Sequence, residues 1–124
     1  MIAALVLLAV STPDPEPLRN AVGTCDVKGL HALMESEPHR RAEFAAAVYG
    51  EQRAIADERT RVQAIAPTGS TAGQATVGQA LALLDTRQKQ LDDARTVERA
   101  WRDLLDEERA DYLANCTNNK RDGK

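Results

Sequence analysis

The stretch Pro67-Thr68-Gly69-Ser70-Thr71-Ala72-Gly73 separates two long segments of helix-favouring composition, residues 26–66 and 76–115. Proline and glycine clustered in this way end a helix and are typical of a turn. Cys25 and Cys116 lie on either side of it, with their midpoint at 70.5. If the chain folds back there as two antiparallel helices, residue i faces about residue 141 − i, and the two cysteines meet. The sequence therefore predicts an all-α fold, a long antiparallel two-helix hairpin closed at its open end by a disulfide.

The second helical segment carries an apolar repeat. Two capping-box patterns, Thr71-x-x-Gln74 and Thr76-x-x-Gln79, signal its start. Apolar side chains then recur at seven-residue steps, interrupted by Glu98, at Val77, Leu84, Leu91, Leu105 and Tyr112. This spacing predicts a helix with an apolar stripe of the coiled-coil type.

The first helical segment contains a proline. Because proline in a helix interior removes a backbone hydrogen bond but is tolerated in a first turn, we expect the first arm to be broken near Pro38. Ser36 is then the N-cap of a new helix that runs to about residue 66, and Trp101 fills the gap at the break. Gly50 lies inside that helix and opposite about Leu91, so we expect the two arms to pack closely there.

Composition limits both the fold and the function. The 124 residues carry 16 Lys and Arg against 19 Asp and Glu, for a net charge of −3. This acidic balance disfavours nucleic-acid binding as the main task. The length allows one small domain, and the aromatic content of 3% disfavours a β-sandwich, because strands draw on aromatic and β-branched residues.

The N-terminal residues predict export. Ile2–Val10 is uninterrupted and apolar, too short for the about 20 residues of a membrane-spanning helix but suited to the core of a secretory signal. We expect a signal peptide over 1–11, a Pro- and acid-rich linker over 12–20, the hairpin domain over 21–116 and a disordered polar tail over 117–124. The protein is then periplasmic or secreted, without an integral membrane span, and its two cysteines form one disulfide. Whether the signal is cleaved or the start codon is misassigned stays open.

Few residues are candidates for metal binding or catalysis. His31, Glu35 and His39 follow one another at four-residue steps and on a straight helix could offer ligands to a transition metal. Because a break at Pro38 would turn His39 away, and no fourth ligand is near in sequence, no metal site and no cofactor are expected. The sequence shows no nucleophile beside an oriented base and no phosphate-binding glycine loop, so we do not expect an enzyme.

The apolar stripes are wider than one hairpin can cover, so we expect a surface that binds protein. Its candidate residues are Leu81, Leu84, Leu91, Trp101, Leu104 and Leu105. The partner is either a second copy, giving a four-helix bundle, or a different protein, and no nucleic acid is expected. The sequence thus favours a small exported bacterial helical protein that acts as a non-enzymatic protein-binding or structural module of the cell envelope.

The segment Arg99-Ala100-Trp101-Arg102-Asp103 through Cys116 resembles the Trp-then-Cys helix of lysozyme-inhibitor proteins of the LprI type. The resemblance spans fewer than 20 residues and implies a periplasmic inhibitor of a lytic enzyme. In that family the cysteine follows the tryptophan more closely and further cysteines are present, whereas here Arg109 stands near the expected position. A helical-hairpin chaperone or metal-stress sensor is a further alternative, which would bind unfolded clients or a metal at His31, Glu35 and His39.

Overall fold

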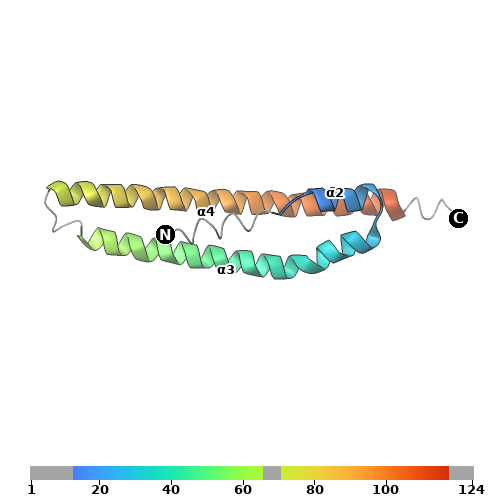
Figure 1. The fold of residues 1–124 in the computed structure, drawn as a ribbon, viewed down its shortest axis with the longest axis horizontal. Coiled ribbons are helices and arrows are strands. Elements are labelled where there is room, and N and C mark those ends of the chain that lie inside the picture. Colours follow the sequence, from blue (N-terminus) through green and yellow to red (C-terminus); the bar gives the residue numbers. More distant parts are fainter. Residues whose placement is uncertain (1–12, 66–70, 118–124) are drawn as a thin grey trace. The chain divides into compact units, whose positions relative to one another are not determined.

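The computed structural model describes residues 13–65 and 71–117, of which 94% are helical, with no strand among them. The chain forms the helices α2 (Glu16–Gly23), α3 (Val27–Ile65) and α4 (Thr71–Tyr112), and α4 continues into one turn of π-helix, η2 (Leu113–Thr117) (Figure 1). The predicted all-α fold is confirmed. The predicted signal peptide, residues 67–70 of the predicted turn and residues 118–124 of the predicted tail lie outside the described residues. The last three residues of the predicted turn, 71–73, are helical in α4.

The described residues divide into two compact units, each containing part of α3 and part of α4. In the first unit, residues 44–65 of α3 pack against residues 71–95 of α4. The side-chain amides of Gln52 and Gln88 donate hydrogen bonds to each other, at 2.8 and 3.1 Å. Their residue numbers add up to 140, so the two helices run antiparallel in the predicted register. The core between them consists of Ile55, Val62, Leu84 and Leu91, with Val48, Val77, Ala80 and Leu81 packed around it.

The second unit contains α2, residues 27–43 of α3, and residues 96–117. Here α2 lies along the last turns of α4 (Figure 1), and the shared core consists of Leu18, Ala21, Leu30, Trp101 and Leu105. The disulfide between Cys25 and Cys116 joins the corner between α2 and α3 to the end of α4, with the two Cα atoms 5.5 Å apart. The predicted pairing of the two cysteines is therefore confirmed.

The predicted break near Pro38 is wrong, because α3 continues through this proline from Val27 to Ile65. Ser36 is not an N-cap; its hydroxyl donates a hydrogen bond to the carbonyl oxygen of Leu33 one turn earlier, at 2.8 Å. A proline in the interior of a helix removes one backbone hydrogen bond, which destabilises the helix. That cost is offset by tertiary contacts beside Pro38, where the neighbouring Glu37 is buried and bound to residues of both long helices.

The actual interruption in the first arm lies between α2 and α3. Cys25 adopts a left-handed backbone conformation there, with φ of 53°, and Asp26 caps α3 by accepting a hydrogen bond from the backbone N–H of Gly29 at 3.0 Å. A Cβ atom at Gly29 would lie 2.5 Å from the Asp26 carboxylate, so a glycine suits this first turn. The cap and the left-handed residue together reverse the chain without a proline.

The predicted linker over residues 12–20 is wrong for its last five residues, which are helical in α2. Pro17 lies in the first turn of this helix, where backbone N–H groups have no acceptor within the helix, so the lack of an N–H in proline has no cost. The Asp14 carboxylate accepts a hydrogen bond from the N–H of Glu16 at 3.0 Å. Leu18 is fully buried in the core of the second unit, so hydrophobic burial fixes a segment whose composition suggested an extended chain.

The predicted close packing at Gly50 is also wrong. A Cβ atom built on Gly50 meets no atom within 4 Å, and the residue lies on an exposed face of α3. The helix at this position would therefore accommodate a side chain without any shift of its neighbours.

Candidate functional site

The predicted interaction surface is largely interior. Leu84 and Leu91 belong to the core of the first unit, and Trp101 and Leu105 belong to the core of the second, each with at most 7% of its surface exposed. Leu81 and Leu104 are partly buried against the same cores. Four of the six predicted surface residues are therefore core residues, because the facing helices already cover them.

A buried cluster of charges occupies the core of the second unit instead. Glu37 and Glu98 are 6% and 4% exposed, and the guanidinium of Arg40 lies between their carboxylates. Arg40 donates hydrogen bonds to Glu37 at 2.7 and 3.0 Å and to Glu98 at 2.7 and 3.0 Å. Arg41 adds a hydrogen bond to Glu37 and Arg102 adds one to Glu98. Each buried carboxylate therefore has two cationic partners.

Trp101 belongs to this cluster and does not fill a gap at a helix break. Its indole Nε1–H donates a hydrogen bond to Glu37 at 3.0 Å, and the Arg40 guanidinium carbon lies 5.8 Å from the ring centroid, within cation–π range. The sequence signal for the cluster was Glu98, the residue that interrupts the seven-residue apolar repeat. Its partner Arg40 was missed because it is 58 positions away in sequence.

The cluster favours the ionised form of Glu37. Burial alone would raise the pKa of Glu37, but hydrogen bonds from Arg40 and Trp101 and the positive charge of Arg40 outweigh it, so this pKa lies below its ordinary value. Hydrogen bonds to the carboxylates, above all to that of Glu37, raise the pKa of Arg40 in turn. No buried side-chain nitrogen or oxygen lacks a partner in the described part of the chain. Such a fully paired cluster is suited to fixing the register of two helices rather than to reacting with a substrate.

The three candidate metal ligands are not brought together. His31 pairs with Glu35 at 2.8 Å, whereas His39 pairs with Glu43 at 3.0 Å. Because α3 is continuous, His31 and His39 are eight residues apart along one helix, about 12 Å at 1.5 Å per residue. Within residues 13–65 and 71–117, no group of three or more His, Cys, Asp or Glu residues is arranged to hold a metal ion.

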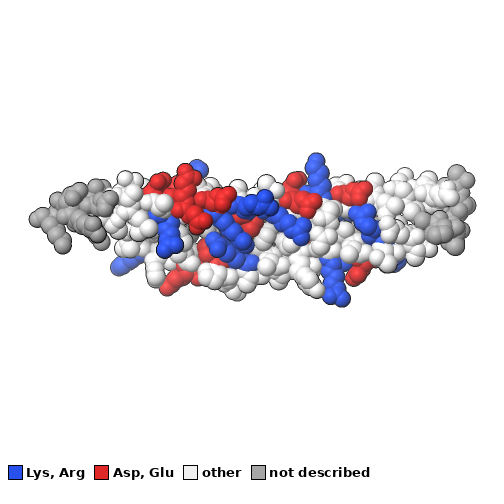
Figure 2. Space-filling view, turned by 180° about the vertical axis from the view of Figure 1, so that it is seen from behind, with Lys and Arg blue, Asp and Glu red and all other residues white. Residues whose placement is uncertain are grey.

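Exposed apolar side chains lie in an uncharged stretch of the first unit. Residues 62–84 contain no Asp, Glu, Lys, Arg or His. Within this stretch Ile65 is 54% exposed and Leu83 is 61% exposed. In Figure 2 the end formed by the beginning of α4 is white, whereas acidic and basic side chains of mixed sign cover much of the remaining visible face. This uncharged end, residues 62–65 and 72–84, is the candidate surface for contact with another protein.

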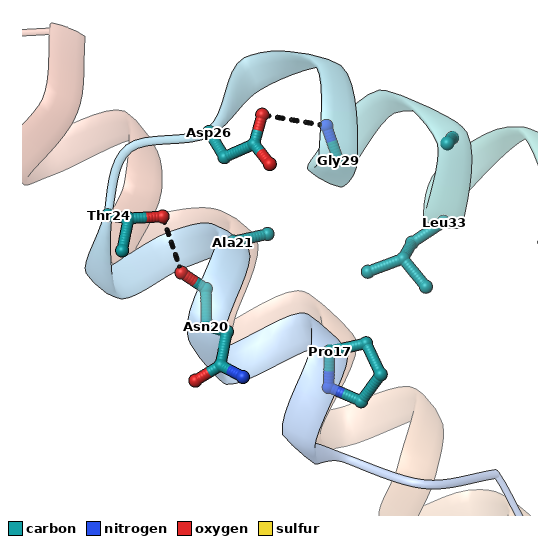
Figure 3. A pocket seen from close by; sticks show the side chains of 8 residues that line it. Pro17, Asn20, Ala21, Thr24, Asp26, Gly29 and Leu33 are labelled. Carbon is teal, nitrogen blue, oxygen red and sulfur yellow. Dashed lines mark hydrogen bonds between the residues drawn. The ribbon is translucent and has the colours of Figure 1, made fainter.

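Two shallow grooves lie in the second unit. The first, of about 430 Å³, lies between α2 and α3, with Pro17 and Leu33 on opposite sides of the hollow (Figure 3). Its polar side chains form hydrogen bonds at the ends of helices. The Thr24 hydroxyl donates one to the Asn20 carbonyl oxygen at the end of α2, and Asp26 caps the start of α3. The second groove, of about 410 Å³, lies between the start of α3 and the end of α4 and includes Arg109.

No helix among the described residues is both long enough and apolar enough to span a membrane. Comparison of the sequence with protein-family models and with curated proteins, and of the fold with solved structures, found no match.

Proposed function

We propose that this chain is a small exported bacterial protein that acts as a non-enzymatic protein-binding module of the cell envelope. The Cys25–Cys116 disulfide supports export, because structural disulfides form and persist mainly in oxidising compartments. The buried cluster around Arg40 and the disulfide both hold α3 and α4 in one register. Both features lie in the second unit, and they suit a helical module in which structure rather than chemistry is fixed.

The observation that carries the proposal is the exposure of Leu83 and Ile65 in the uncharged end. Water in contact with these side chains is released when another apolar surface covers them, which favours association. The partner that fits best is a second copy of the same chain. A symmetric contact places one surface against its own counterpart, so a surface without charge avoids the repulsion between like charges that a charged one would meet.

The uncharged end also allows close approach between helices. Ala72, Ala75 and Ala82 are exposed on α4, and a Cβ atom at Gly78 would meet nothing within 4 Å. Small side chains on an exposed helix face let a second pair of helices approach without displacing large groups. Two hairpins joined at this end would form a local four-helix bundle.

Sedimentation velocity of the disulfide-bonded chain tests this proposal. We expect a dimer at tens of micromolar, and we expect Leu83→Glu to convert it to a monomer because two new carboxylates would be desolvated and face each other. Val97→Glu is the matched control: Val97 is exposed on the same helix, outside the uncharged end, and its substitution should leave the dimer intact. A monomeric wild type, or equal effects of the two substitutions, would contradict the proposed surface.

The proposed location needs its own measurement. Thiol labelling of the chain in a periplasmic fraction should find no free thiol before reduction and two after it, since the described cysteines are paired. Accumulation of the fully reduced chain in the cytosol would contradict export.

A further inference from the structure

The groove at the end of α4 has the dimensions of a small-molecule site. Its volume is about 410 Å³, within the range of about 300–1,000 Å³ typical of ligand pockets. It is formed between the first two turns of α3 and the last turn of α4 with the start of η2, and it is lined by Val27, Leu30, His31, Met34, Arg109, Tyr112 and Leu113. All of these residues belong to the second unit.

The groove has a fixed apolar floor and an apolar rim exposed to water. Leu30 on the floor is 7% exposed and belongs to the core, and Met34 and Tyr112 pack against the same core. At the rim, Val27 is 51% exposed and Leu113 is 52% exposed. An apolar chain laid in the groove would remove both rim side chains from water, while the flexible thioether of Met34 adjusts to its shape.

The groove also holds a cation that is free to bind a ligand. The side chain of Arg109 makes no hydrogen bond or ion pair with any residue in the described ranges, unlike that of Arg102, which binds Glu98 at 2.9 Å two turns earlier. Asp106 lies three positions before Arg109, within reach on the same helix, but makes no ion pair with it in the described structure, and the positions four before and four after are Leu105 and Leu113. The other basic residue of the lining, His31, is already paired with Glu35 at 2.8 Å.

From these features we propose that the groove binds a fatty acid, with its acyl chain along the apolar lining and its carboxylate on the guanidinium of Arg109. The planar guanidinium presents two parallel N–H donors that match the two oxygens of a carboxylate. The lining matches a ligand with both parts, because Val27 and Leu113 offer only apolar contacts and the guanidinium of Arg109 offers a positive charge. A groove of this volume suits the single chain of a fatty acid better than the two chains of a phospholipid.

Isothermal titration of the disulfide-bonded full chain with dodecanoate, kept below its micelle concentration, tests this proposal. Dodecanol and dodecyltrimethylammonium supply the same chain with no charge and with the opposite charge. We expect saturable binding of dodecanoate and weaker binding of the other two. Arg109→Gln should weaken dodecanoate binding about tenfold or more, from the loss of hydrogen bonds to a charged group.

Two further variants separate a specific site from general adhesion. Leu113→Ser, at the rim, should weaken the binding of both dodecanoate and dodecanol, because part of the apolar lining is lost. Arg99→Gln is the matched control, since Arg99 is exposed on the same helix and outside the groove, and it should leave dodecanoate affinity unchanged. Circular dichroism of each variant checks that the helices are intact. The proposal is overturned if dodecanoate does not bind, if Arg109→Gln and Arg99→Gln have equal affinity, or if all three ligands bind alike.

Discussion

Replacing Arg40 with methionine removes the cation that joins Glu37 to Glu98 across α3 and α4. Methionine retains most of the length and apolar character of the side chain, so the substitution tests charge and hydrogen bonding more than volume. Four hydrogen bonds are lost, two to each carboxylate. Both carboxylates remain buried after the change, each with one weaker cationic partner, from Arg41 or Arg102.

The expected cost follows from that arrangement. Removing one partner of a buried ion pair destabilises a protein by about 3–5 kcal/mol, mainly because the other charge is left without compensation. Because Arg41 and Arg102 still contact the two carboxylates, we expect the free energy of unfolding of Arg40→Met to fall by about 3 kcal/mol at neutral pH, the lower end of that range.

The same substitution changes the pH dependence of stability. In the wild type the pKa of Glu37 is lowered from its ordinary value of 4.5, so its contribution to stability is present above pH 4.5 and is lost as the pH falls through the folded-state pKa. Without Arg40, burial still opposes ionisation of Glu37 and only the hydrogen bonds from Trp101 and Arg41 favour it, so the pKa of Glu37 is lowered less than in the wild type and its contribution above pH 4.5 is reduced. The difference between wild type and variant should therefore be largest near neutral pH and shrink in acid.

Urea denaturation with the disulfide intact measures both effects, followed by circular dichroism for the helices and by fluorescence for Trp101. Arg99→Met is the control, because it removes the same charge from an exposed position and should change stability by less than about 0.5 kcal/mol. The reasoning is refuted if Arg40→Met costs less than about 1 kcal/mol, as an exposed ion pair does, and if that cost is the same at neutral pH and in acid.

Two other substitutions test the disulfide and the exposed helix face. Replacing both Cys25 and Cys116 with serine opens a loop of 91 residues and should lower the free energy of unfolding by about 4–5 kcal/mol in the chain-entropy treatment, measured by urea denaturation; an unchanged midpoint would show that the crosslink does not stabilise the fold. Gly50→Ala should raise stability by about 0.5–1 kcal/mol in the same assay, because alanine favours the helix and its Cβ meets no neighbour. A loss of stability at Gly50 would instead indicate the close packing that the sequence had predicted.

The register of the hairpin was predictable because it depends on distances along the chain. Two helices of equal rise that reverse at one turn bring together residues equally far from that turn. The facing pairs observed agree with this, since the residue numbers of Gln52 and Gln88 add up to 140 and those of Arg40 and Glu98 add up to 138. The disulfide followed from the same count.

The path of the chain around Pro38 was not predictable from local rules. Serine followed by proline two residues later predicts the start of a helix. However, α3 continues through this point, because Glu37 and Arg40 form hydrogen bonds with side chains of α4. In the same way, the acidic and proline-rich composition of residues 12–20 predicted an extended linker, whereas part of this segment belongs to the helix α2, whose residue Leu18 is buried in the core. In both places tertiary contacts, formed by residues far apart in sequence, outweighed local preference.

The sequence by itself determined that two long helical segments pair antiparallel and which cysteines meet, because helical periodicity and equal arm lengths are properties of the chain alone. The tertiary structure decided which apolar side chains are surface and which are core. Leu84 and Leu83 are neighbours in one helix, yet they are 3% and 61% exposed, because only Leu84 faces α3. The seven-residue repeat already put Leu84 on the apolar stripe and left Leu83 off it, but whether that stripe is covered, and so where a binding surface can lie, depends on the opposing helix.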